Sequence, residues 1–199
     1  NYPPQPIGEK LIVVPCWNPE AGDRIPVILD PGLTFGTGAH PSTQMVMEFM
    51  ENCVRPGFRC LDLGSGSGIL SIAALRLGAG SAIGVDIDPK AEDIARENAA
   101  YNGFAAPEFT ALTGNVTQDH ALMASLRENR YDVVLVNIVA DVIIALAPEV
   151  RPFLKENGYF LTSGIIDTRA DEVESALRAA GWEILERNSN EDWYSFLCR

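Results

Sequence analysis

The run RCLDLGSGSGILSIAALRLG, residues 59–78, decides the fold. Arg59–Leu63 predicts a buried strand, Gly64–Gly68 a turn, and Ile69–Leu77 a helix that stops at Gly78. Glycines between a strand and a helix let the backbone approach a ligand at the N-terminus of the helix. Such a loop is weak evidence alone, because a tight strand-to-helix turn also favours glycine.

Strands and helices alternate on both sides of this run. We predict further strands at residues 11–14, 25–29, 82–85, 109–112, 131–136 and 159–162. We predict helices from Ser42, as cap, to about residue 53, from Asp88 (cap) and Pro89 to residue 103, at 119–129 and at 168–180, with helical segments after Asn137 closed by Asn157-Gly158. This order predicts an α/β fold with a mostly parallel sheet covered by helices on both faces.

The C-terminal end of the chain breaks the alternation. Residues 182–187 and 193–198 are both rich in β-forming residues, and a short polar loop, residues 188–192, joins them. Two such runs across a short loop predict an antiparallel hairpin that closes the sheet.

Composition limits the classes of function. The chain has 199 residues and a formal net charge of −12, which disfavours direct DNA binding and anionic membranes and is compatible with a basic partner. Solubility alone would also explain the charge. With four cysteines outside any C-x-x-C pair and two histidines, we expect no metal site. No signal peptide or membrane span is evident, so we expect a cytoplasmic protein. Because the chain begins with Asn1, we expect an N-terminal partner domain to be missing.

Asp86 gives the glycine loop a partner. It ends the strand that follows, 22 residues after Gly64. In a βαβ unit this spacing puts a carboxylate beside the glycine turn, where it accepts hydrogen bonds from ribose hydroxyls. The alternative is a solvated acid at a strand end, which is also an interpretation for Asp88.

The loop, Asp86 and the terminal hairpin together resemble the Rossmann-like class I methyltransferases, which use S-adenosylmethionine. The resemblance implies a seven-stranded sheet whose last strand is antiparallel. It also implies that Gly64, Gly66 and Gly68 line the methionine end of S-adenosylmethionine and that Asp86 holds the ribose. Ile87, Asn115 and Val116 would contact the adenine.

Asn137 ends the predicted strand at residues 131–136 and is the candidate catalytic residue. In amine methyltransferases of this class, an asparagine here starts an N-P-P-aromatic motif and accepts hydrogen bonds from the substrate amine. Here Ile138 and Val139 replace the prolines, which argues against a nucleobase or glutamine substrate. Asn137 also suits a helix N-cap, and one residue can do both.

A longer resemblance covers the chain from about residue 11. The runs DPGLTFGTGAHPST (30–43), LDLGSGSGILSIAALRLGA, GVDIDPKA and VVLVNI are similar to the ribosomal protein L11 methyltransferase family. Ala39 and Ser42 stand where threonine is usual, and Ser65 where cysteine is common. The resemblance implies methylation of lysine ε-amino groups, and of an α-amino group, on a ribosomal protein of the large subunit.

The segment before residue 43 is the specific part of this likeness. We expect Phe35, Gly36 and Thr37 to fold over the cofactor, and the Thr43 hydroxyl to meet its methionine carboxylate. We expect a structural role for His40. Residues 1–41 would then form strands and a covering loop within the same domain as the cofactor-binding core, residues 42–199.

Three other functions are alternatives to a ribosomal protein methyltransferase. A lysine methyltransferase for another protein, such as electron-transfer flavoprotein, shares much of the pattern. A non-catalytic module that binds S-adenosylmethionine also fits. A nicotinamide-dependent oxidoreductase would need the third glycine at position 69, where the chain has isoleucine.

Overall fold

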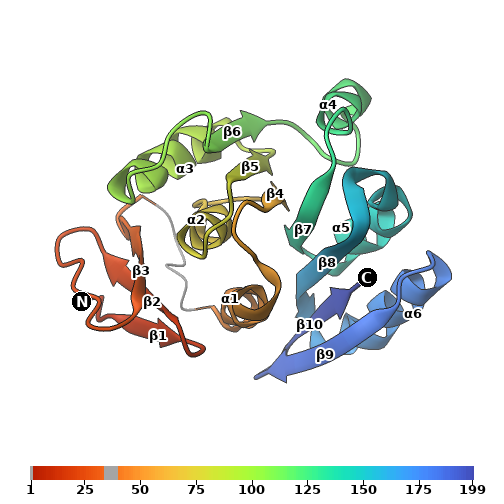
Figure 1. The fold of residues 1–199 in the computed structure, drawn as a ribbon. Coiled ribbons are helices and arrows are strands. Elements are labelled where there is room, and N and C mark those ends of the chain that lie inside the picture. Colours follow the sequence, from red (N-terminus) through yellow and green to blue (C-terminus); the bar gives the residue numbers. More distant parts are fainter. Residues whose placement is uncertain (1, 34–39) are drawn as a thin grey trace.

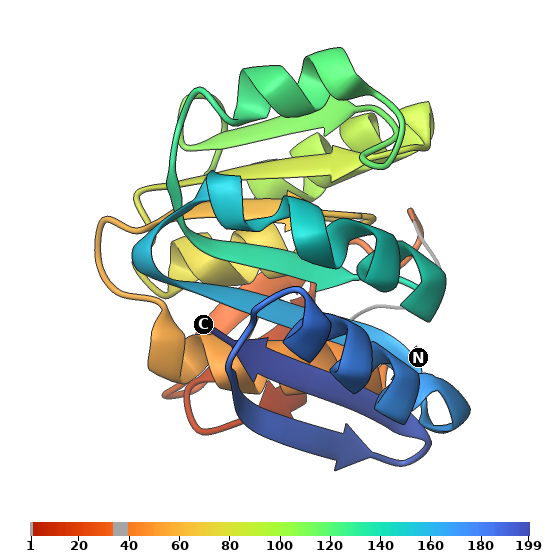
Figure 2. The ribbon, with the colours of Figure 1, turned by 90° about the vertical axis from the view of Figure 1, so that its right-hand side faces the viewer.

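The computed structural model describes residues 2–33 and 40–199. Its main sheet has seven strands in the order β6-β5-β4-β7-β8-β10-β9, with β6 and β9 at opposite edges (Figure 2). The strands are β4 (Arg59–Leu63), β5 (Ser81–Asp86), β6 (Phe109–Thr113), β7 (Tyr131–Asn137), β8 (Leu154–Ile166), β9 (Ile184–Asn190) and β10 (Trp193–Cys198). Strands β4 to β8 pair in parallel, and β10 runs antiparallel to both β8 and β9. The predicted fold class is confirmed, including the terminal hairpin.

Six α-helices in the described part of the chain cover the sheet, three on each face (Figure 1). Helices α1 (Pro41–Cys53), α2 (Ile69–Arg76) and α3 (Pro89–Tyr101) share one hydrophobic core with one face of the sheet. Helices α4 (His120–Leu126), α5 (Ala140–Leu146) and α6 (Ala170–Ala179) share a second core with the other. Short 3-10 turns lie at Ala147–Glu149, Arg151–Phe153 and Asp167–Arg169.

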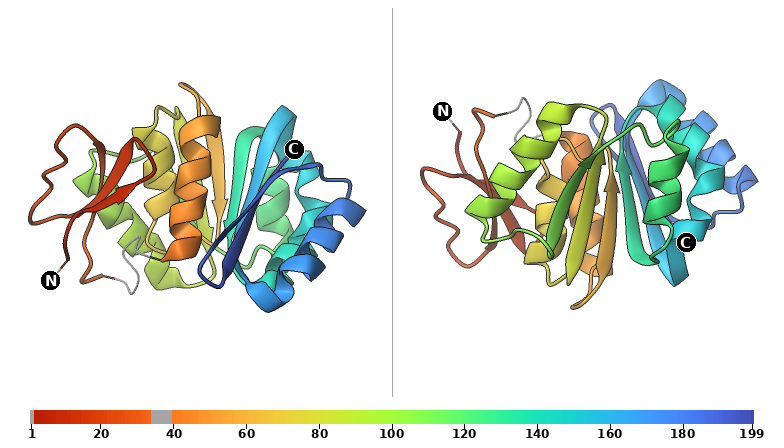
Figure 3. Two further views of the ribbon diagram at one scale, coloured as in Figure 1. Left: turned by 90° about the horizontal axis from the view of Figure 1, so that it is seen from below. Right: turned by 90° about the horizontal axis from the view of Figure 1, so that it is seen from above.

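A separate three-stranded sheet covers the outer side of the α1–α3 layer (Figure 3). It consists of β1 (Gln5–Ile7), antiparallel to β2 (Leu11–Pro15), which is parallel to β3 (Ile25–Leu29). The sequence predicted β2 and β3 but missed β1. Prolines at 3, 4 and 6 argue against a strand in this stretch, since proline cannot donate a backbone hydrogen bond to a neighbouring strand. An edge strand tolerates them.

Buried polar side chains fasten this small sheet to the helices. Glu51 on α1 accepts hydrogen bonds from the backbone N–H groups of Glu9, Lys10 and Leu11, each at 2.9 Å. Asn102, the C-cap of α3, accepts from the Ile28 N–H at 2.9 Å and donates to the Ile28 carbonyl at 2.8 Å. A side chain therefore takes the place of a neighbouring strand at the edge of β3.

The start of α1 differs from the prediction. His40, rather than Ser42, is the N-cap, and its ring nitrogen accepts the Ser42 N–H at 3.2 Å. Pro41 follows in the first turn, where its missing N–H costs nothing. The His40 ring also packs edge-on against Trp193, with centroids 4.7 Å apart. Both contacts fit the structural role expected of His40. The other predicted cap, Asp88, is confirmed.

Strand β8 is much longer than predicted, and the predicted helix end at Asn157-Gly158 is wrong. The 3-10 turn ends at Phe153, and β8 already begins at Leu154. The register of the β7–β8 pairing shifts here: Tyr131 pairs with Leu154, but Val133 pairs with Tyr159. An advance of two residues along β7 therefore corresponds to five residues along β8. Asn157 lies in this bulge with φ of 65°. An Asn-Gly pair favours a left-handed residue, which suits a strand bulge as well as a helix end.

Candidate active site

A cleft of about 370 Å³ opens at the carboxyl ends of β4, β5 and β7. Six residues predicted for the site lie in its lining: Gly64, Asp86, Ile87, Asn115, Val116 and Asn137. Val85, Gly114, Thr117, Ile138 and Val142 complete the lining. In open α/β sheets, ligands bind at this end of the strands, so the topology and the predicted residues agree.

The glycine loop is held in a conformation that suits glycine. Gly64, Gly66 and Gly68 have φ of 87°, 51° and 86°. A Cβ on Gly64 would lie 2.5 Å from Cγ1 of Ile138, and one on Gly68 would lie 3.1 Å from the Cβ of Ala95. Gly64 lines the cleft, whereas Gly68 packs against α3. A Cβ on Gly66 would meet no atom of the described residues within 4 Å.

Hydrogen bonds from backbone N–H groups hold the Asp86 carboxylate in place at the edge of the cleft. Its Oδ2 accepts the Gly66 N–H at 2.9 Å, and its Oδ1 accepts the Asp88 N–H at 2.9 Å. A carboxylate has about four acceptor positions. The two remaining positions allow Asp86 to accept two further hydrogen bonds, as a pair of hydroxyl groups would require.

The walls of the cleft on either side of Asp86 are largely apolar. Ile87 is 66% exposed although it is a large hydrophobic residue. Val116 and Val142 line the same cleft and pack against the second core. Asn115 holds its own loop, since its Oδ1 accepts from the Thr117 N–H at 3.0 Å and the Thr117 hydroxyl at 2.7 Å. A flat apolar ring would cover Ile87.

Asn137 and Thr43 are brought together although 94 residues separate them in sequence. The side-chain amide of Asn137 donates to the Thr43 hydroxyl at 3.1 Å. Nearby, the Ser163 hydroxyl donates to the Ser42 carbonyl at 2.9 Å. The N-terminus of α1 is thus joined to the ends of β7 and β8. The alternative in which Asn137 caps a helix is wrong, because Val139 is the N-cap of α5.

Gly164, which the sequence reasoning missed, lies against Asn137. It has φ of 84°, and a Cβ there would lie 2.9 Å from Oδ1 of Asn137 and 2.7 Å from the Ile138 carbonyl oxygen. Only glycine fits this position without displacing Asn137. The signal in the sequence was a glycine two residues after the predicted strand, which is too common to single out.

Asp62 is a buried carboxyl group beneath the glycine loop that the sequence reasoning also missed. It is 1% exposed, and its Oδ2 accepts the Ser71 hydroxyl at 2.9 Å. Burial raises the pKa of Asp62 to about 7, although the Ser71 hydrogen bonds work in the opposite direction. Within the described residues its Oδ1 has no hydrogen-bond partner. An aspartate within the apolar strand 59–63 was the available signal.

Three predicted residues, Phe35, Gly36 and Thr37, lie outside the described residues. Within residues 2–33 and 40–199, no group of three or more His, Cys, Asp or Glu side chains could hold a metal ion. Burial raises the pKa of the Cys60 thiol to about 12, which fits a residue packed as a small hydrophobe. No helix in the described ranges is long and apolar enough to cross a membrane.

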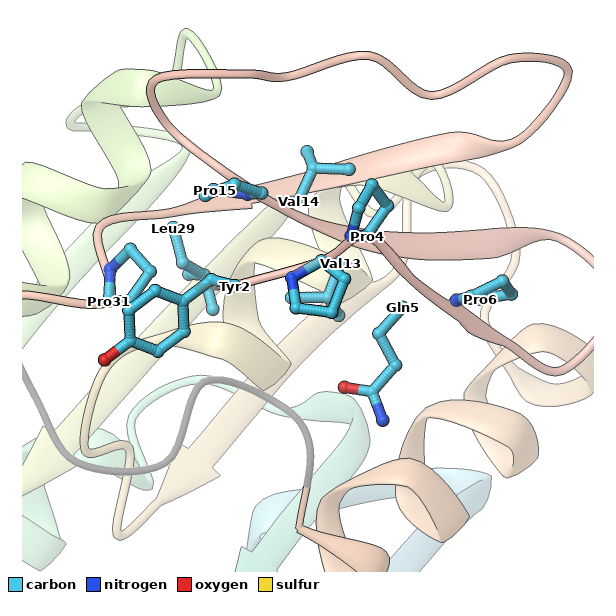
Figure 4. A pocket seen from close by; sticks show the side chains of 10 residues that line it. Tyr2, Pro4, Gln5, Pro6, Val13, Val14, Pro15, Leu29 and Pro31 are labelled. Carbon is cyan, nitrogen blue, oxygen red and sulfur yellow. The ribbon is translucent and has the colours of Figure 1, made fainter.

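A second cleft, of about 450 Å³, lies on the three-stranded sheet (Figure 4). Prolines, Val13, Val14 and Leu29 line it, with Tyr2 and Gln5 as its polar side chains. It is larger than the cleft at the strand ends but contains no charged group. We therefore assign the chemistry to the smaller cleft.

The chain matches the family model of ribosomal protein L11 methyltransferase (PrmA) over residues 1–199. A ribosomal protein L11 methyltransferase from Desulforamulus reducens is 42% identical over 99% of this chain and 62% of its own length. Its counterpart from Caldanaerobacter subterraneus is 41% identical over 100% of this chain and 62% of its own length. The chain therefore spans about 62% of the length of these curated relatives.

Solved structures agree with the sequence comparisons. The ribosomal protein L11 methylase from Lactobacillus delbrueckii subsp. bulgaricus superposes with a TM-score of 0.88 and 30% identity, covering 100% of this chain and 98% of that one. SMU.776, crystallised in complex with SAH, gives a TM-score of 0.69 at 16% identity over 81% of this chain and 50% of its own, a likeness of fold alone. The resemblance drawn from the sequence motifs is confirmed: the chain belongs to the ribosomal protein L11 methyltransferase family.

Proposed function

We propose that this chain transfers methyl groups from S-adenosylmethionine to lysine ε-amino groups, and to an N-terminal α-amino group, of ribosomal protein L11. The observation that carries the proposal is the Asn137–Thr43 hydrogen bond at a cleft that Gly64 and Asp86 also line. Family membership supports the substrate, since the relatives are named for it. The activity is a proposal because the chain spans only part of their length.

The cleft has the size and chemistry for the cofactor. Its volume of about 370 Å³ falls within the range of small-molecule sites, about 300–1,000 Å³. We assign the ribose hydroxyls to Asp86, the adenine to Ile87, Asn115 and Val116, and the methionine end to the glycine loop and Thr43. Phe35, Gly36 and Thr37 remain our candidates for a covering segment.

The reaction requires an aligned, neutral amine. Bound S-adenosylmethionine would supply a methyl group on a positively charged sulfur, which disfavours a nearby ammonium ion. Deprotonating a free lysine at pH 7 costs roughly 4–5 kcal/mol, given a reference pKa near 10.4. The oxygen of Asn137 would accept an amine N–H and so direct the nitrogen lone pair toward the methyl group. Alignment, rather than a strong base, is the main contribution of the protein.

Thr43 and Gly164 make Asn137 suited to this role. The bond to Thr43 holds the amide nitrogen toward α1, so the carbonyl oxygen faces Gly164. Since glycine has no side chain, the oxygen takes this position without a clash. The amide would therefore be oriented before the substrate arrives.

The charge of the chain is compatible with this partner. A formal net charge of −12 attracts a basic protein and disfavours direct contact with DNA or anionic lipid. We propose that the reaction takes place in the cytoplasm, with ribosomal protein as the partner.

Two measurements test the proposal. Thermal unfolding should shift upward with S-adenosylmethionine or S-adenosylhomocysteine, and not with NAD. Labelled methyl groups should then pass from S-adenosylmethionine to ribosomal protein L11 in preference to electron-transfer flavoprotein. Stabilisation by NAD alone would contradict the cofactor, and preferred labelling of the flavoprotein would contradict the substrate.

A further inference from the structure

Helix α3 carries the buried Asn98, and one turn later the buried Asn102 caps its C-terminus; the two residues are 0% and 8% exposed. The sequence predicted no role for either residue. Both side-chain amides bond to the backbone at or just after β3. Only Asn98 also reaches the glycine loop. The two residues therefore form a natural pair for comparison.

Asn98 connects two segments that are far apart in the sequence. Its Oδ1 accepts the Asp30 N–H at 2.9 Å, and its Nδ2 donates to the Ser67 carbonyl at 2.9 Å. Asp30 and Ser67 lie 68 and 31 residues from Asn98. Because a buried amide bonded at both ends cannot rotate without losing a hydrogen bond, it fixes the two segments relative to each other.

On one side, Asn98 supports the loop that positions Asp86. Ser67 lies between Gly66, whose N–H is bonded to the Asp86 carboxylate, and Gly68. Gly68 packs against Ala95, three residues before Asn98 on the same helix. Helix α3 thus holds the loop by a close contact at Ala95 and a hydrogen bond from Asn98.

On the other side, Asn98 holds the backbone where β3 ends. Asp30 directly follows β3, and its side chain accepts the Gly32 N–H at 2.8 Å. The same stretch of sequence continues to His40, the cap of α1, and to Thr43.

We infer that Asn98 is a positioning residue for the cofactor, because it joins the glycine loop, which holds the Asp86 carboxylate, to the backbone at the end of β3. The inference rests on the proposed function, in which the cleft binds S-adenosylmethionine. Without the Asn98 amide, the loop and Asp30 lose their common support. Cofactor binding must then order both segments, which weakens affinity.

The matched experiment uses the pair of asparagines. Calorimetry with S-adenosylhomocysteine would give Kd for the wild type, Asn98→Ala, Asn98→Asp, Asn102→Ala and Asn102→Asp, well below each melting temperature. We expect Kd to rise about tenfold or more for both Asn98 variants and to stay within about twofold for the Asn102 variants. Asn98→Asp is informative because it keeps an acceptor for Asp30 and loses the donor to Ser67.

A structural role alone predicts a different pattern. If Asn98 only stabilises the fold, the Asn98 and Asn102 variants will all have a lower Tm than the wild type, and none will have a changed Kd. That result would overturn the inference. If the wild type itself binds no S-adenosylhomocysteine, the proposed function fails and the inference with it.

A measurement on the wild type tests the inference even if the variants do not fold. Added S-adenosylhomocysteine should slow amide hydrogen exchange at Asp30, which is bonded to Asn98. Exchange at Ile28, bonded to Asn102, should keep its rate. Equal slowing at both amides, or none at Asp30, would contradict the role of Asn98.

Discussion

At the scale of single residues, the site consists of short-range hydrogen bonds between positions distant in sequence. Asp86 and the glycine loop were predictable, because a strand, a turn and a spacing of 22 residues bring them together in any βαβ unit. The Asn137–Thr43 bond was not predictable, since it depends on where α1 lies across the ends of β7 and β8. Gly164 and Asp62 were missed for the same reason, as their importance comes from neighbours on other elements, Asn137 on β7 and Ser71 on α2.

Thr43→Val tests the orientation of Asn137. Valine keeps the shape of threonine but removes the hydroxyl that accepts the Asn137 N–H, so the amide is no longer held. We expect kcat for methyl transfer to fall about tenfold, equivalent to ~1.4 kcal/mol. Thr43→Ser restores the hydroxyl and should recover most of the rate. Equal kcat in Thr43→Val and the wild type, at saturating cofactor, would show that the bond does not matter.

Asp62 predicts a dependence of stability on pH. Its folded-state pKa of about 7 lies above the ordinary value of 3.8, so the folded protein binds the proton more tightly than the unfolded chain. Its contribution to stability is therefore full below about pH 4 and is lost as the pH rises toward 7. Asp62→Asn cannot ionise. The melting temperature of the wild type should fall relative to Asp62→Asn between pH 4 and pH 7, and parallel curves would contradict the raised pKa.

At the scale of elements, most helices and strands could be predicted from periodicity and from glycine and proline, while their ends could not. Strand β1 was not predicted because the prolines in and before it disfavour a strand. Strand β8 was predicted too short because Asn157-Gly158 is also typical of a helix end. At α1, a histidine took the capping role expected of Ser42. In each case local sequence allowed two structures, and tertiary packing selected one.

Glu51 is the main polar link between α1 and the three-stranded sheet. Glu51→Ala leaves three backbone N–H groups without their acceptor, so we expect a loss of about 2–4 kcal/mol in the free energy of unfolding. Urea titration measures this loss. Glu48→Ala, on the exposed side of the same helix, is the control and should change stability by less than about 0.5 kcal/mol. Similar losses for both variants would argue against the link.

At the scale of the whole molecule, two sheets enclose the α1–α3 layer, and α4–α6 cover the far face (Figure 3). This arrangement places α1 between the two sheets. Its C-terminal end meets the three-stranded sheet through Glu51, and its N-terminus meets β7 and β8 through Thr43 and Ser42. The described residues 2–33 are thereby joined to α1 and α3 by buried contacts. The sequence alone predicted the order of strands and helices along the chain. It did not predict that the three-stranded sheet packs on helices α1–α3.

We propose that the cleft at the ends of β4, β5 and β7 holds S-adenosylmethionine and that Asn137 aligns the amine that receives the methyl group. The most direct test compares the rate of methyl transfer to ribosomal protein L11 by the wild type and by Asn137→Ala, at saturating S-adenosylmethionine, with the Kd of S-adenosylhomocysteine measured for both. We predict labelled L11 with the wild type and a rate at least about a hundredfold lower with Asn137→Ala, at a Kd within about tenfold. Full turnover by Asn137→Ala with unchanged cofactor affinity would contradict the account.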